Sequence, residues 1–319
     1  MKLLLTALCY ELDSLTGKTI VEIMRGGLGF EPTRLRTDKF LKSSGKLTDR
    51  WLKKLAGTDE LQTLEIQSSL GPGGPSLQYT RFLDWGFQGL FLRTPYDSAP
   101  DLARMLKLTS IKGFTFAACA DSDDVQWQSE TFISNYETSG RSYAGMAKVY
   151  DPTWERDMID IKQNPGRISL FVGMWLQSGW RMWFGQPSFK YMPPRRLLSF
   201  PQAQIAEQLK SKVIFLQLYP DADAFAERDN RARQAAFRKW MGMDIYEDHA
   251  TDFLASSGKS DPPHEMKSGK FPHGGVWHYM EWLDQHGNLT RRSKAVKKRE
   301  SEYDENLKRV WQGDVTACR

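Results

Sequence analysis

The runs FTFAA at residues 114–118 and VIFLQLY at residues 213–219 decide the expected fold. Both are short, apolar and enriched in aromatic or β-branched side chains, which is typical of buried strands. A segment with apolar residues at helical spacing precedes each run, and acidic residues follow it. We therefore expect a helix, a buried strand and an acidic loop, in that order, at both places.

The two helices of this repeated pattern have the same predicted start. Each begins at a Ser, has Pro in its first turn and carries a polar partner three residues after the Ser, as in a capping box. Because the two patterns lie about 100 residues apart, the sequence is consistent with two related α+β halves that arose by internal duplication. Chance recurrence of a common pattern is the alternative. The apolar positions are Leu102, Met105 and Leu106 in the first helix, and Ala203, Ala206 and Leu209 in the second.

The remaining patterns extend this prediction to an α+β fold with mixed or antiparallel sheets and packed helices. The expected strands lie at about 2–11, 61–67 and 77–93. The expected helices lie at about 16–24, 48–56, 226–241 and 290–311, most of them with a Thr cap or a Gly stop.

The predicted chain organisation has three parts. Residues 1–140 form an N-terminal α+β half, and residues 141–254 form a C-terminal α+β half with a Trp-rich core. Residues 255–319 form a linker, marked by the Ser- and Pro-rich stretch 256–263, and a charged helical extension.

Composition narrows the class of protein. The 319 residues carry 44 Lys and Arg against 39 Asp and Glu, and most of the net charge of +5 lies after residue 287. The body therefore lacks the basic face of a nucleic-acid-binding protein. A mean hydropathy of -0.54 argues against a membrane protein. Three widely spaced Cys fit a reducing compartment. We expect a cytoplasmic protein without membrane or direct nucleic-acid contact.

No catalytic motif is complete in the sequence. TGKT at 16–19 lacks the first Gly of a phosphate-binding loop, and Ser178 lacks the flanking Gly residues of a nucleophile elbow. The five His lie between 249 and 286 without metal-ligand spacing. We therefore expect no enzyme activity, no cofactor and no metal.

Two alternatives stay open. One is a metal-dependent hydrolase or nuclease that uses the His-bearing C-terminal segment, where Glu265 and Lys267 imitate part of a nuclease pattern. The other is a nucleic-acid-associated accessory protein that uses the basic tail after residue 287.

The densest aromatic segment is 171–185, with three Trp and two Phe. Strand alternation places Trp175 and Trp180 on opposite sides of the chain. The segment is predicted to be mainly core. The functional alternative is an exposed aromatic anchor for a protein partner, because Trp and Arg are frequent at interface hot spots.

This segment also carries a family resemblance. NPGR at 164–167, GMWLQSGWRMWFG at 173–185 and LLSF at 197–200 resemble the immunity protein 52 family of bacterial polymorphic-toxin systems. The resemblance covers roughly residues 1–254 and leaves the tail unexplained. It includes the strand end at Leu218 and Tyr219, and six positions of the following helix: Asn230, Arg231, Gln234, Phe237, Arg238 and Trp240.

The resemblance implies a cytoplasmic, non-catalytic protein that binds one toxin stoichiometrically. Members of the family resemble antidotes to restriction-endonuclease-like toxins, often effectors of type VI secretion. A toxin that cuts nucleic acid presents a basic cleft, so acidic residues on the antidote would accelerate encounter. The candidate partner-binding residues are Asp121, Asp123, Asp124, Trp127, Asp221, Asp223, Glu227 and Asp229.

Overall fold

The computed structural model describes most of the chain. The described residues are 1–37, 45–58, 61–70, 73–83, 85–99, 101–151, 155–171, 173–244, 247, 264–268, 270–287, 290, 294–304 and 308–316. The predicted linker at 256–263 lies outside them.

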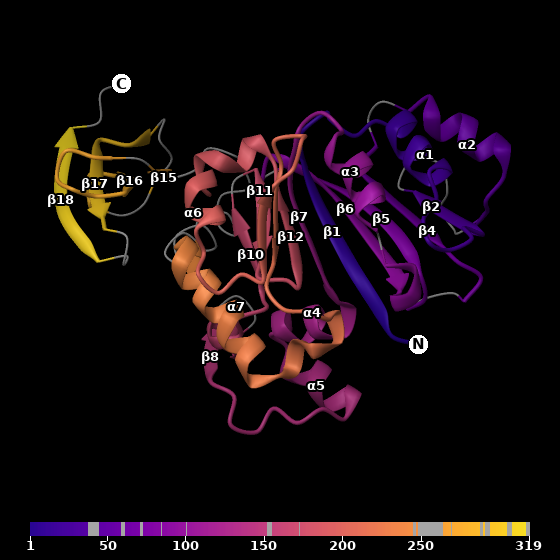
Figure 1. Cartoon of the computed structure of the whole chain (residues 1–319). Helices are drawn as coiled ribbons and strands as arrows, with labels where there is room; N and C mark the ends of the chain where they lie inside the picture. The colour runs from indigo at the N-terminus through magenta and orange to yellow at the C-terminus, as the bar shows by residue number, and fades with distance from the viewer. Residues whose placement is uncertain are drawn as a thin grey trace.

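Within these residues, one ten-stranded antiparallel sheet forms the body of the protein (Figure 1). Its central strands are long, apolar and almost wholly buried, as the two opening runs predict. In spatial order the strands are β13 (Ile205–Gln208), β14 (Ile214–Gln217), β12 (Arg181–Phe184), β7 (Phe114–Asp121), β1 (Leu3–Glu11), β6 (Phe87–Pro95), β5 (Ser76–Phe82), β4 (Thr63–Gln67), β2 (Arg34–Thr37) and β3 (Gly45–Lys46).

Helices α1 (Gly17–Arg25) and α3 (Leu102–Thr109) cover one face of this sheet, and α2 (Asp49–Ala56) packs on α1. The Tyr10 hydroxyl of β1 donates to the Leu108 carbonyl of α3 at 3.1 Å. Gly17 allows α1 and α2 to approach closely, because a Cβ there would lie 1.9 Å from the Leu55 carbonyl oxygen. Thr16 and Thr48 cap α1 and α2 through their hydroxyls, as predicted.

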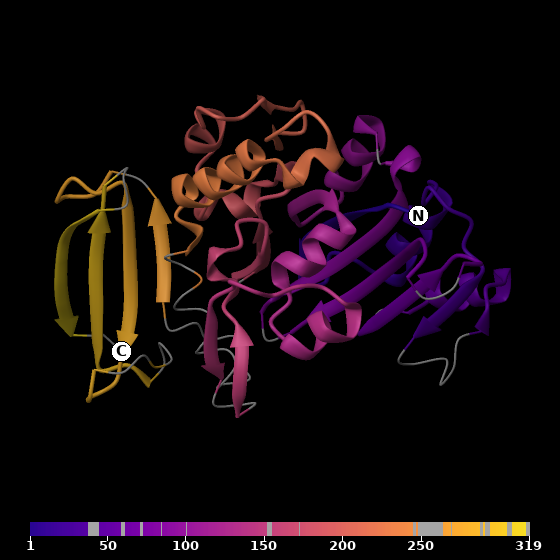
Figure 2. The ribbon, with the colours of Figure 1, turned by 90° about the horizontal axis from the view of Figure 1, so that it is seen from below.

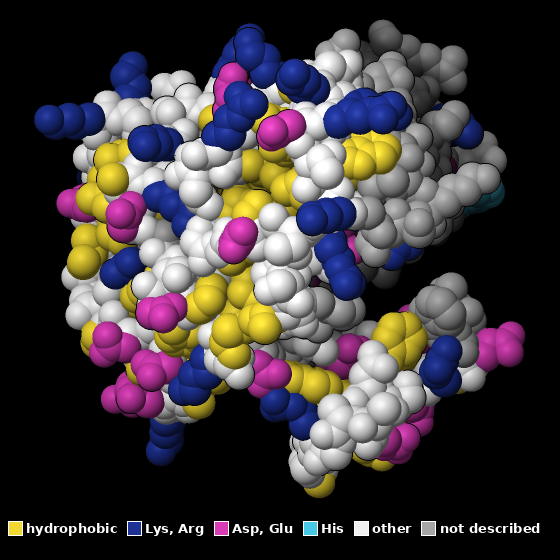
Figure 3. All heavy atoms as spheres, turned by 90° about the vertical axis from the view of Figure 1, so that its right-hand side faces the viewer, with side chains coloured by type: hydrophobic (Ala, Val, Ile, Leu, Met, Phe, Trp, Pro, Cys, Tyr) yellow, Lys and Arg dark blue, Asp and Glu magenta, His cyan; other side chains and the backbone are white. Residues whose placement is uncertain are grey.

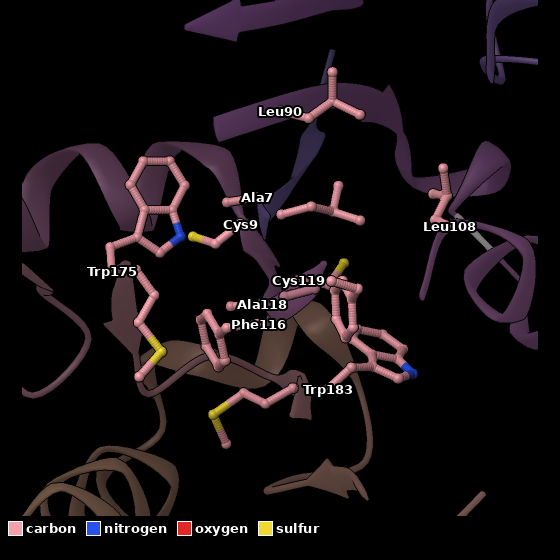
Figure 4. Close-up of a cluster of buried hydrophobic side chains, with 14 of the residues drawn as sticks. Ala7, Cys9, Leu90, Leu108, Phe116, Ala118, Cys119, Trp175 and Trp183 are labelled. Carbon is pink, nitrogen blue, oxygen red and sulfur yellow. The ribbon is translucent and has the colours of Figure 1, made fainter. Parts of the chain in front are cut away.

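The opposite face is covered by a small hairpin and by two helices, one from each half of the chain. The hairpin consists of β10 (Ile168–Phe171) and β11 (Met174–Gln177), and the helices are α4 (Ser122–Ser129) and α7 (Arg228–Met241). Trp175 of β11 packs on Phe91 of β6, with ring centroids 4.3 Å apart. Figure 4 shows Trp175 beside Cys9 and Trp183 on the other side of the sheet.

The Trp-rich segment is therefore core, as predicted. Trp175, Trp180 and Trp183 are all buried, so they do not form an exposed aromatic anchor. Trp175 contacts strands of the first half of the chain, which means that residues on both sides of the predicted boundary near 140 share one sheet and one core. The predicted halves are not separate packing units.

A smaller antiparallel sheet follows the main body. It contains β15 (His264–Ser268), β16 (Trp277–Leu283), β17 (Lys297–Tyr303) and β18 (Arg309–Thr316), in that order, and lies at one end of the molecule (Figure 2). The Arg196 guanidinium lies over the Trp277 ring at 4.9 Å and links it to α6 (Pro194–Leu198).

The α+β class is confirmed, but two predicted helices are wrong. The charged stretch 290–311 contains strand β17, which pairs on both sides and buries Ser301 and Glu302. The apolar positions from Ala203 to Leu209 belong to edge strand β13 and its flanks, which pair with β14. In both places strand pairing outweighs local helix propensity. The repeated pattern therefore keeps its two strands and loses its second helix.

The remaining described elements connect these layers. They are α5 (Ile133–Ser139), the hairpin β8 (Lys148–Asp151) with β9 (Arg156–Ile159), and the 3-10 turns η1 (Tyr96–Ser98), η2 (Ile161–Gln163), η3 (Gln186–Lys190) and η4 (Ala222–Ala226).

Buried arginines fix α7 against the hairpin β10–β11. Arg238 of α7 donates to Ser169 Oγ at 2.6 Å and to the Arg167 carbonyl at 3.2 Å. The guanidinium groups of Arg238 and Arg167 both form ion pairs with Asp244 and Glu247, which follow the helix. A buried cation needs such partners, because an unpaired one would be strongly destabilising. This network anchors the C-terminal part of α7 on the hairpin.

Candidate protein-binding surface

The two acidic segments meet at one end of the main sheet. Strand β12 is antiparallel to both β7 and β14, so β7 and β14 run in the same direction and end at the same edge. Asp121 ends β7, and Asp221 follows β14 closely. Figure 1 shows α4 and the beginning of α7 together at this end. Residues about 100 positions apart therefore form one region, which we call the acidic end.

Asp121 and Asp124 are structural members of this region. Asp121 caps α4 by accepting from the Asp124 amide at 2.7 Å, and it accepts from the Tyr96 hydroxyl at 2.7 Å. Asp124 forms a two-pronged ion pair with Arg231 of α7, with 2.9 Å between Asp124 Oδ2 and Arg231 Nη1. Both carboxylates are about 95% buried. Direct contact of Asp121 and Asp124 with a partner, as the sequence predicted, does not fit this burial.

Asp123 and Trp127 form an exposed unit one turn apart on α4. The Trp127 indole N–H donates to Asp123 Oδ1 at 3.0 Å. Arg141, which follows α5, lies over the Trp127 ring at 4.5 Å and pairs with Asp123. Tyr136 of α5 packs on the same indole with ring centroids 4.9 Å apart. The unit shows that this surface can hold a guanidinium between a carboxylate and an aromatic face.

The second acidic segment faces solvent. Asp221, Asp223, Glu227 and Asp229 are all exposed, on η4 and the first turn of α7. Glu227 accepts from the Asn230 side chain at 3.1 Å, and Asn230 also donates to the Ala224 carbonyl. Asp229 lies in the first turn of α7, where a negative charge is favourable. Asp221, Asp223 and Asp229 can contact a partner without disturbing the core, whereas Glu227 also supports the buried Asn230 side chain.

The Tyr96 hydroxyl lies close to both acidic segments. Burial, the hydrogen bond to Asp121, and the charges of Asp121 and Asp223 all raise the pKa of Tyr96 above its ordinary value. Asp223 therefore lies near the same phenol as Asp121. Tyr96 and Arg141 were not predicted from the sequence, since no local motif marks either of them.

Charges are unevenly placed on the adjoining face of the molecule. Figure 3 views the right-hand side of Figure 1 and shows Lys and Arg side chains mainly toward the top of this face, and Asp and Glu side chains with some Lys and Arg among them toward the lower left.

The described His residues of the C-terminal segment make local contacts with Glu side chains. His273 Nδ1 lies 2.8 Å from Glu302 and His278 Nε2 lies 3.3 Å from Glu300. Glu265 and Lys267 lie on strand β15. His249 lies outside the described residues. Among the residues that the structure describes, no three His, Cys, Asp or Glu side chains are grouped to hold a metal ion.

In the described part of the chain, no helix combines the length and the apolar content that crossing a membrane requires.

Comparison with known proteins adds one structural likeness. No family model matches the chain, and no curated protein matches it. The chain is similar to the solved structure of the Pseudomonas aeruginosa T6SS protein PA0821, with a TM-score of 0.48 and 12% sequence identity. The match covers 77% of this chain and 74% of that chain.

Proposed function

We propose that the chain is an immunity protein, which neutralises a restriction-endonuclease-like toxin of a type VI secretion system by direct, stoichiometric binding. The resemblance at 164–240 supports this class of function. The observation that carries the proposal is the convergence of two distant acidic segments into one acidic end.

The acidic end has the properties that an inhibitor of a nuclease needs. Its exposed carboxylates, on Asp221, Asp223 and Asp229, face outward from a rigid support. A nuclease carries a basic cleft for its substrate, so complementary charges would raise the association rate well above that of a neutral pair. Inhibition of a lethal enzyme requires a Kd near 1 nM or below, about −12 kcal/mol.

Aromatic contacts would provide the slow dissociation. Trp127 is partly exposed beside Asp123, and it already stacks with the Arg141 guanidinium. An arginine of the toxin that displaced Arg141 would be held in the same way, between the Trp127 indole and the Asp123 carboxylate. The exposed carboxylates would thus mainly raise the association rate, and Trp127 would mainly lower the dissociation rate.

The experiment is co-purification of this chain with the toxin encoded by the neighbouring gene. The chain and the toxin are expressed together, one tag is used for capture, and the complex is assayed for DNA cleavage. We expect a one-to-one complex with no nuclease activity. A neighbour that neither binds the chain nor harms cells lacking it would contradict the proposal.

A charge-reversal variant tests the surface. Asp221→Lys, Asp223→Lys and Asp229→Lys are combined, and the toxin association rate is measured by stopped flow. We expect at least a tenfold lower rate and a weaker salt dependence. The control combines Glu31→Lys, Asp49→Lys and Glu207→Lys, three exposed acids elsewhere with the same change in net charge. Equal rates for the two triple variants would show that the acidic end is not the docking surface.

The two alternatives from the sequence predict different results. A hydrolase that uses the C-terminal His residues would copurify with metal and lose activity in His273→Ala. An accessory protein that uses the basic tail would bind DNA in a salt-dependent way and lose that binding on truncation at residue 287.

A further inference from the structure

One face of the main sheet is open to solvent at strands β2, β4 and β5. Residues of these strands that point to the other face, among them Leu35 and Ile66, are buried in the core. The second layer over the sheet ends near Phe82 and Phe91, which pack on Trp175 of the hairpin. In Figure 2 the strands toward the right of the sheet are seen without a described helix in front of them. We call the solvent-facing side of β2, β4 and β5, with the adjoining parts of β3 and β6, the open face.

The strand register brings four cations onto the open face. Residues directly opposite each other on paired strands share a face. One such row runs from β3 to β6 and consists of Lys46, Arg34, Gln67, Ser76 and Arg93. Arg36 lies on the same face as Arg34, about 7 Å along β2, and Arg93 lies three strand spacings from Arg34, roughly 14 Å. No run of basic residues marks this face in the sequence, because its cations come from three strands.

These cations have little compensating negative charge. Lys46, Arg34 and Arg36 are exposed and Arg93 is partly exposed, so a ligand can reach all four. None of the four forms an ion pair with a described residue, whereas Arg81 at another end of the sheet pairs with Asp13.

The acid of these rows, among the described residues, is Glu65, which lies directly opposite Arg36. Its carboxylate accepts from the side chains of Gln67 at 2.7 Å and of Gln78 at 3.4 Å. Glu65 is therefore held by amides, and the three arginines keep their charge available for an anion.

The side chains of the open face favour a polyanion over a protein partner. The centre of a protein interface is depleted in charge and enriched in aromatic side chains, whereas this face presents Arg, Lys, Gln and Thr. Guanidinium groups bind phosphate in a bidentate geometry. The grooves of duplex DNA admit a helix or a two-stranded ribbon, while single strands can lie across a sheet. A flat, cationic sheet face thus fits a single strand.

We infer that the open face binds single-stranded nucleic acid through its phosphates, with Arg34, Arg36 and Arg93 as the main contacts. A strand that crosses from β2 to β6 follows the row of cations and has about three of its phosphates neutralised. Binding of this kind is electrostatic and nearly independent of base sequence. The inference is independent of the proposed function, because none of its residues belongs to the acidic segments 121–124 and 221–229.

The test is fluorescence anisotropy of a labelled oligo(dT) of about 12 nucleotides, titrated with the full chain at several salt concentrations. We expect a Kd of about 10 µM at about 50 mM NaCl, and a log–log salt slope of about −2, since each neutralised phosphate of a single strand contributes about −0.7. Poly-glutamate of the same length should compete at least tenfold more weakly than unlabelled oligo(dT). Equal competition would indicate a surface for acidic protein and would overturn the inference, as would no binding at about 100 µM chain.

A triple variant places the binding on the open face. Arg34→Gln, Arg36→Gln and Arg93→Gln are combined, and we expect at least tenfold weaker binding and a salt slope near zero. The control combines Arg25→Gln, Arg50→Gln and Arg195→Gln, three exposed arginines elsewhere with the same change in net charge, and should bind within about twofold of the parent. Melting temperatures of both variants show that the fold is kept. An equal loss of binding in the two triple variants would place the nucleic acid elsewhere on the chain and refute the assignment.

Discussion

The two acidic segments 121–124 and 221–229 follow parallel-running strands that end at the same edge of the sheet, yet their carboxylates have different surroundings. In the first, Asp121 and Asp124 turn inward and bind Tyr96 and Arg231. In the second, the carboxylates stay at the surface. Similar acidic patterns therefore have different roles, and the difference lies in what the rest of the fold places opposite them.

The inward segment supports the outward one. The Asp124–Arg231 ion pair joins α4 to α7, and α7 begins directly after the exposed acids of η4. A carboxylate that stabilises the fold is thus a positioning group for the surface. Variants of the two segments should accordingly affect different properties, and the following predictions test this division.

The largest expected effect is on stability at the inward segment. Asp124→Ala removes the buried carboxylate that pairs with Arg231, so we expect the free energy of unfolding to fall by about 3 kcal/mol. Asp229→Ala, at the outward segment, should change it by less than about 0.5 kcal/mol. Urea denaturation of both variants measures the difference. Equal losses of stability in Asp124→Ala and Asp229→Ala would contradict the separation into a stabilising inward segment and a solvent-exposed outward segment.

A smaller effect is expected at Asp121. Asp121→Ala removes the cap of α4 and the acceptor for Tyr96, each worth about 1 kcal/mol, so we expect a loss of about 2 kcal/mol. Asp121→Asn keeps a capping oxygen and should lose less than half of that. Thermal unfolding compares the two. If Asn and Ala cost the same, capping by Asp121 does not stabilise α4.

The smallest effect is a pH dependence. Burial raises the pKa of the Asp124 carboxyl, with Arg231 acting in the opposite direction. A folded pKa above the unfolded value of about 3.9 gives stability that is fully present below about pH 4 and lost as pH rises through the folded pKa. As pH rises from about 4 through the folded pKa of Asp124, the free energy of unfolding of the parent protein should therefore fall relative to that of Asp124→Asn, which cannot ionise at this position. If the free energy of unfolding changed with pH in the same way in the parent protein and in Asp124→Asn, the pKa of Asp124 would not be raised in the folded state.

The sequence predicted elements well where local and tertiary preferences agree. The first strand, the Thr-capped helices α1 and α2, and α7 with its Gly242 stop all lie within a few residues of their predicted positions. Prediction failed at β13 and β17, whose residues have helical spacing or high helix propensity but form strands. There the deciding hydrogen bonds come from neighbours distant in sequence.

The candidate site was predicted in part. The acidic runs after each strand are visible in the sequence, but their burial is not, because it depends on Tyr96 and Arg231, which lie 25 and 107 residues away from their partners. The open face was not predicted at all. Its row of cations exists only where β2, β4, β5 and β6 pair, so no pattern within one of these strands marks it.

By itself, the amino-acid sequence determined the α+β class, the buried strands β1, β7 and β14, and the ends of α1, α2 and α7, because hydrophobic periodicity and capping act over a few residues. Only the tertiary structure decided that one sheet joins the two predicted halves, that one acidic segment faces inward and the other outward, and that Arg34 and Arg93 share one face of the sheet. These features depend on contacts between residues far apart in the chain, where burial and pairing of charges outweigh local preference.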